Sequence, residues 1–197
     1  MRAVLRWLGA LTLLAGAVGV LRHRRDTVRV RRGELPAATA AADLPPARAA
    51  GPLGERLAGW VPAPPRSLAG RVVTGLWAAS LTAPGMAVAV LSGAVPRWSD
   101  ADQCWVAVGV SGPSGLALRS VGADANTIGQ VVLCRSEEPR RSLLAHEVVH
   151  VRQAERLGPL LLPAYLWLAA RYGYRDHPLE RAARAGARQR LAAPDRR

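Results

Sequence analysis

The chain of 197 residues contains no phenylalanine and no lysine, and it has only two cysteines and four histidines. All 27 basic residues are therefore arginine, and with 14 acidic residues they give a formal net charge of +13. Two cysteines are too few for a disulfide framework or a cysteine-rich zinc ribbon. We expect Cys104 and Cys134 to be small buried residues, and a single bridge between them is the alternative if the domain lies outside the cytoplasm.

The positive charge is densest at residues 22–32, which read RHRRDTVRVRR and follow an apolar run. A basic chain is attracted to nucleic acid and to anionic lipid. Nucleic-acid binding would call for arginine interleaved with aromatic residues or for a known reader motif, and neither is present. The position of the cluster therefore favours a membrane-flanking role.

Two uncharged stretches of the sequence indicate that the protein is associated with a membrane. Residues 7–21 have the length of a signal-peptide core, with an uncleaved anchor helix as the alternative. Residues 72–95 carry no charge and are long enough to cross a bilayer, although a buried hairpin turning at Pro84-Gly85 would read the same way. Arginines precede this second stretch, so the positive-inside rule predicts that the residues after it face outward.

Four segments follow from these patterns. Residues 1–32 form an N-terminal hydrophobic segment with a basic flank, and 33–71 are an Ala/Pro/Arg-rich linker without regular structure. Residues 72–96 are the transmembrane or buried hydrophobic segment. Residues 97–197 form the folded domain.

The folded domain is predicted to be α+β, with short antiparallel strands followed by helices. The strand candidates, rich in β-formers, are residues 104–110, 116–121 and 127–135. The helix candidates are residues 140–157, ending at Gly158-Pro159, residues 160–170, and a last helix that begins at Pro178.

The helix at 140–157 carries the sequence HEVVH, with His146 and His150 four positions apart and Glu147 beside the first. Each helical residue turns by about 100°, so the two imidazoles lie on one face and can bind one metal ion. Glu147 can accept a proton from water at the metal without being a ligand. The alternative is that both histidines are ordinary residues of an amphipathic helix.

The stretch resembles the signature helix of the zincin metallopeptidases. More narrowly, residues 126 to about 185 resemble a group of small, mostly uncharacterised bacterial membrane-associated proteins, on the segments TIGQVVL, HEVVHVRQAERLGPLLLPAY and YRDHPLERAAR. The resemblance implies a helical zincin-like C-terminal part, one zinc ion and hydrolysis of peptide bonds.

A catalytic zinc ion takes three protein ligands, so one more is needed. Glu155 points away on the same helix and Asp195 lies in the terminal tail, which leaves Asp176, His177 and Glu180. Zincins with a glutamate third ligand often carry E-x-E-A-D on a later helix, and here Glu180 begins the sequence ERAAR. The resemblance therefore favours Glu180, although Ala182 stands in place of the motif's second glutamate and Arg184 in place of its aspartate.

We thus expect a zinc-dependent metallopeptidase of the bacterial cell membrane, with zinc on His146, His150 and Glu180, with Glu147 as the catalytic base, and with a peptide or protein substrate. The metal-binding domain is expected outside the cytoplasm, and nucleic acid is not an expected partner. Two alternatives remain. One is a non-catalytic membrane protein with a structural metal, and the other is a basic membrane-surface or nucleic-acid binding module without metal.

Overall fold

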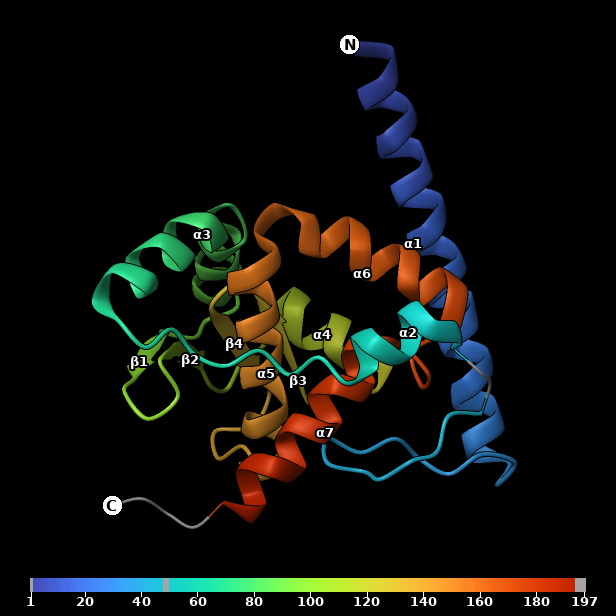
Figure 1. Ribbon diagram of the computed structural model, residues 1–197. Coiled ribbons are helices and arrows are strands. Elements are labelled where there is room, and N and C mark those ends of the chain that lie inside the picture. Colours follow the sequence, from blue (N-terminus) through green and yellow to red (C-terminus); the bar gives the residue numbers. More distant parts are fainter. Residues whose placement is uncertain (1, 48–49, 194–197) are drawn as a thin grey trace.

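The computed structural model describes residues 2–47 and 50–193 and combines helices with one small sheet (Figure 1). The N-terminal elements are α1 (Arg2–Arg31), α2 (Gly51–Ala58) and α3 (Leu68–Leu91). The central elements are β1 (Arg97–Ser99), β2 (Cys104–Ala107), α4 (Gly112–Val121), β3 (Ala125–Ile128) and β4 (Val131–Cys134). The C-terminal elements are α5 (Arg141–Leu157), the 3₁₀ turn η1 (Gly158–Leu160), α6 (Leu161–Tyr172) and α7 (Pro178–Ala192).

The α+β class is confirmed, but the prediction of a purely antiparallel sheet is wrong. The strand order is β1-β2-β4-β3, and the central pair β2 and β4 is parallel. The outer pairs β1–β2 and β3–β4 are antiparallel. Parallel neighbours cannot be joined by a tight turn and need a crossover. Here α4 and β3 supply that crossover.

Two strand predictions fail for local reasons. Residues 116–121 belong to α4, which has Pro113 in its first turn and ends at Gly122 in the left-handed conformation. Residues 127–135 are divided into the β3–β4 hairpin by a turn at Gly129, where φ is +64°. A Cβ atom at Gly129 would lie 2.4 Å from the Thr82 backbone nitrogen, so the hairpin can approach α3 only with glycine there.

The sheet lies between two helical layers, because alternate residues of the fully buried strand β4 face opposite sides. Val131 and Leu133 pack with residues of α3 and α4 in one apolar cluster. Val132 and Cys134 pack with residues of α5 in the other cluster.

The two cysteines lie in the second cluster, on β2 and β4. Both thiols are free and fully buried, as the small-buried-residue interpretation predicts. Burial raises the pKa of each thiol to about 12.

Helix α3 runs through Pro84 without a break, so the hairpin turn considered at Pro84-Gly85 does not form. By length and composition it is the one helix, among the described residues, that could cross a membrane, and most of it is exposed. Its buried residues are small, and a Cβ atom at Gly85 would come within 2.5 Å of the Ile128 carbonyl oxygen. The small residues therefore bring α3 close to the β3–β4 hairpin.

The three predicted C-terminal helices are present as α5, α6 and α7. Figure 1 shows α5 in the middle of the molecule, with α6 along one edge and α7 crossing in front. Residues 33–71, expected to be a linker without regular structure, instead include α2 and the start of α3. This segment contacts α7, where Glu55 forms a bidentate ion pair with Arg181 at 2.9 Å. This chain segment thus lies beside the helix that carries Glu180.

Candidate metal site

Helix α5 buries two opposite faces, which explains how one helix can be both amphipathic and a ligand carrier. Val148 and Val151 point into the apolar cluster on the sheet. His146 and His150 lie on the other side, since steps of about 100° per residue place them far around the helix from the valines. That polar face meets α7 and α6, which bury His146 and cover most of His150.

The two histidines and Glu180 bring three donor groups to one point. The Nε2 atoms of His146 and His150 are 3.2 Å apart. Glu180 places Oε2 3.2 Å from Nε2 of His146 and Oε1 3.2 Å from Nε2 of His150. All three residues are inward-facing, and the group could hold a metal ion.

The outer nitrogen of each imidazole is bound to an acceptor that orients the ring. Nδ1 of His146 donates to the Ala40 carbonyl oxygen at 2.9 Å, and Nδ1 of His150 donates to Oε1 of Gln153 at 2.8 Å. The Gln153 amide in turn donates to the Leu179 carbonyl oxygen on α7 at 3.2 Å. With Nδ1 engaged in this way, Nε2 of each ring presents its lone pair to the shared point.

The charges around this point favour a cation. Burial opposes protonation of His150, but the Glu180 carboxylate outweighs burial and raises the pKa of His150 to about 9. Burial also opposes ionisation of Glu180, yet His150 and His146 hold the pKa of that carboxyl well below its ordinary value. A metal ion would therefore replace a proton shared within an ion pair.

Helix α7 delivers Glu180 because it begins early and packs closely. Pro178 occupies its first turn, as predicted, and Glu180 follows in that same turn. Small residues at the contact let α7 approach α5: a Cβ atom at Gly186 would lie 2.6 Å from Cγ2 of Val149. This close contact sets how far the Glu180 carboxylate reaches toward the histidines.

Glu147, the predicted base, is buried between the two faces of α5. Its Oε2 accepts a hydrogen bond from the Thr127 hydroxyl on β3 at 2.7 Å. Its charge reaches the site, because it contributes to the raised pKa of His150. Glu147 thus stands beside the three donors without belonging to them.

The other third-ligand candidates are engaged elsewhere. His177 is the N-cap of α7: its Nδ1 accepts from the Leu179 amide at 3.2 Å, and its Nε2 donates to the Tyr165 carbonyl oxygen at 3.0 Å. Burial lowers the pKa of His177 to about 4, so this ring is neutral. Asp176 accepts from the Ala47 amide at 3.1 Å. Glu155 pairs with Arg152, as its position on the far side of α5 predicts.

Glu180 is also held by groups behind it. The Tyr165 hydroxyl donates to its Oε1 at 2.6 Å. Arg184, which stands where the zincin motif has an acidic residue, is buried and donates to the Arg175 carbonyl oxygen. Tyr165 therefore holds the Glu180 carboxylate, and Arg184, at the position of the motif's aspartate, bonds to the backbone instead.

Gln153 is the functional residue that sequence reasoning missed. It lies three positions after His150 and therefore on the same helix face, a spacing that could have indicated it. The contact between His146 and the Ala40 carbonyl could not be predicted from the sequence, because it involves a backbone atom more than 100 residues away.

The donor set fits zinc. Two imidazole nitrogens and a carboxylate oxygen are ligands that zinc prefers, and three protein ligands leave one position open. Ligands at 2.0–2.1 Å in tetrahedral geometry would be separated by about 3.3 Å. Here the two Nε2 atoms are 3.2 Å apart, and each lies 3.2 Å from a different oxygen of the Glu180 carboxylate.

Comparison with known proteins gives one partial match. Residues 98–158 match the family model of the eCIS core domain, a domain of extracellular contractile injection system proteins. No curated protein and no solved structure matches the chain. The matched span includes His146, Glu147 and His150 but ends before α6 and α7, so Glu180 lies outside it. The chain is thus similar to the eCIS core domain over less than a third of its length.

Proposed function

We propose that this protein is a zinc-dependent hydrolase of peptide bonds, with His146, His150 and Glu180 as the metal ligands. The observation that carries the proposal is the buried cluster in which the two imidazole Nε2 atoms lie 3.2 Å apart and each lies 3.2 Å from one oxygen of the Glu180 carboxylate, with a separate buried carboxylate, Glu147, on the same helix. A purely structural site has no need for that extra carboxylate. Glu147 follows the ligand His146 in the sequence, but its carboxylate accepts a hydrogen bond from the Thr127 hydroxyl and is not one of the three ligands.

Each residue then has a distinct role. Zinc, when bound, lowers the pKa of water and polarises a carbonyl group. Glu147 accepts the proton that water loses and passes it to the leaving amine. Gln153 and the Ala40 carbonyl hold the two imidazoles in orientation. Tyr165 holds the Glu180 carboxylate through its hydroxyl group.

A structural metal site is the second candidate, and burial favours it. His146 is 5% exposed and Glu180 is 3% exposed. The segment before α2 lies directly against the site through the Ala40 carbonyl, and Arg188 on α7 donates to the Ala42 carbonyl oxygen at 2.7 Å. A substrate would reach the site only if this segment moved.

The experiment pairs zinc analysis with cleavage of fluorescein-labelled casein by the full chain. Wild-type protein should bind about one zinc ion per chain. Glu147→Gln should keep the zinc and lose about 10² to 10⁴ in rate, because the amide cannot accept the proton. Glu180→Ala should lose both zinc and activity.

Asp176→Asn is the matched control, because Asp176 is an acidic residue four positions before Glu180. Its carboxylate accepts a hydrogen bond from the Ala47 backbone amide and is not one of the three ligand groups. It should keep zinc and activity. If Glu147→Gln equals wild type in every assay while zinc still raises the melting temperature, the structural candidate replaces the hydrolase. If wild-type protein binds no zinc after metal-replete refolding, both metal functions are excluded.

A further inference from the structure

Three uncharged helical surfaces remain exposed, and the metal site explains none of them. No charged residue occurs in residues 7–21, 72–96 or 157–170, which contribute to α1, α3 and α6. A surface helix of a soluble domain normally places charged residues on its outward face. Here that face carries large apolar residues at least half exposed, for example Leu14, Leu21, Leu76, Leu91, Leu162 and Trp167.

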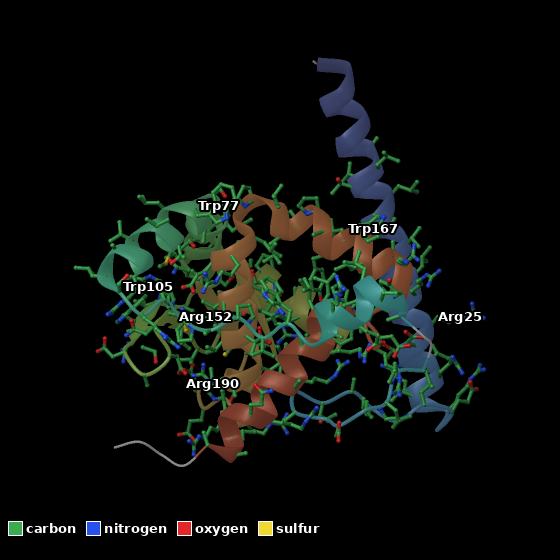
Figure 2. The ribbon with its side chains drawn as sticks, in the orientation of Figure 1. Arg25, Trp77, Trp105, Arg152, Trp167 and Arg190 are labelled. Atoms are coloured by element: carbon green, nitrogen blue, oxygen red, sulfur yellow. The ribbon has the colours of Figure 1, made fainter. Side chains whose placement is uncertain are left out.

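These surfaces join into one face. Helix α3 contacts η1, η1 contacts α6, and α6 packs along α1. In Figure 1, α3 and α6 lie along the same edge of the molecule, and the N-terminal part of α1 projects beyond that edge. Figure 2 places Trp77, on α3, and Trp167, on α6, along this edge. Exposed apolar surface of this extent marks a contact with another apolar phase.

The packing of α3 defines its orientation on such a phase. Its inner side is fixed to the hairpin, where the Thr82 hydroxyl accepts from the backbone N–H of Gln130 at 3.1 Å and Gly85 contacts Ile128. In this packing α3 lies along the domain and has only its outer side free. It would therefore lie in the plane of a membrane surface, as interfacial helices do.

The sequence of helix α1 changes from apolar to basic close to where the helix meets this face. Gly16 and Gly19 face Leu166 and Ala169 of α6, so the helices are closely apposed there. The part of α1 before that contact projects beyond the face in Figure 1, and its Leu11, Leu13 and Leu14 are more than half exposed. After Leu21 the sequence becomes basic, and Arg24 and Arg25 are exposed one turn further along the helix. Figure 2 shows Arg25 on the outer side of α1.

We propose that α1, α3 and α6 form a docking face for a bilayer containing anionic phospholipid, with the apolar end of α1 inserted. The occupant is lipid because an apolar helix end, two exposed tryptophans and a basic boundary occur together at this face. Tryptophan prefers the membrane interface, and arginine at the boundary pairs with anionic headgroups. The apolar run of 15 residues would be about 22 Å long as a helix, compared with about 30 Å for the hydrocarbon core. The proposal does not depend on zinc or catalysis.

The first test locates the face with single labelled cysteines in the full chain. The native thiols are fully buried, so Leu76→Cys and Leu162→Cys can each be labelled with the fluorophore NBD. In vesicles of phosphatidylcholine and phosphatidylglycerol, doxyl-labelled lipid should quench both labels. Leu191→Cys is the matched control, because it lies near the end of α7 away from this edge and should not be quenched.

Two outcomes would overturn the docking face. The labels at positions 76 and 162 could stay unquenched in vesicle-bound protein, which would mean that protein or water covers them. The label at position 191 could be quenched equally, which would mean that lipid contact is not confined to this face.

The second test concerns the basic boundary. Arg24→Gln together with Arg25→Gln should reduce partitioning into the mixed vesicles roughly 25-fold, at about fivefold per arginine. The matched control is Arg140→Gln with Arg141→Gln, which removes the same charge from the start of α5. An equal loss in both double variants, or the same partitioning into pure phosphatidylcholine, would overturn the role of the anionic lipid.

Discussion

Replacing Gln153 by alanine tests whether the metal site depends on a residue that is not a ligand. The side chain is fully buried and makes two hydrogen bonds, one with Nδ1 of His150 and one with the Leu179 carbonyl oxygen. Removing it leaves both partners unsatisfied, at about 1–3 kcal/mol each. We therefore expect the metal-free protein to lose about 2–6 kcal/mol of stability.

The effect on zinc follows from the orientation of His150. Loss of the acceptor frees the ring to rotate or to change tautomer, and loss of such a partner typically weakens metal affinity about 10- to 100-fold. That range corresponds to about 1.4–2.7 kcal/mol of binding free energy. Gln153→Glu keeps an acceptor at this position and should retain most of the zinc affinity.

The assay is a competitive zinc titration against a chelator, with melting temperature measured on the metal-free protein. Gln130→Ala is the matched control, because the Gln130 amide donates to Glu155 at 2.8 Å and makes no bond to the histidines. If Gln153→Ala binds zinc as tightly as wild type, or if Gln130→Ala weakens zinc equally, the hydrogen bond to His150 does not support the site.

Two further predictions concern proton competition and helix packing. The pKa of metal-free His150 is raised to about 9, so zinc must displace a proton below that pH. Affinity should fall about tenfold per pH unit on acidification, as zinc titrations at several pH values would show, and a flat profile would contradict this. Gly186→Val should push α7 from Val149, cost about 1–3 kcal/mol and weaken zinc binding, whereas Ala185→Val, at a less buried neighbouring position, should change both little.

The helix period by itself determined half of the candidate site. His146 and His150 share a face of α5 because four residues make slightly more than one turn, and this geometry needs no other part of the chain. The helix period also predicted that Glu155 points away from the site, and the proline at position 178 predicted the start of α7. Local conformational preferences of this kind can be read from neighbouring residues.

Only the tertiary structure decided the third donor and its partners. Asp176, His177 and Glu180 lie within five residues, and the start of α7 separates their roles: His177 caps the helix while Glu180 turns inward. The parallel pairing of β2 with β4 likewise depended on α4, a segment that its β-forming residues had predicted to be a strand. Glu180 and the Ala40 carbonyl reach His146 from 34 and 106 residues away. Such contacts form only when whole layers pack, because the free energy that selects them comes from burial of the sheet and α5 together and not from the residues around each position.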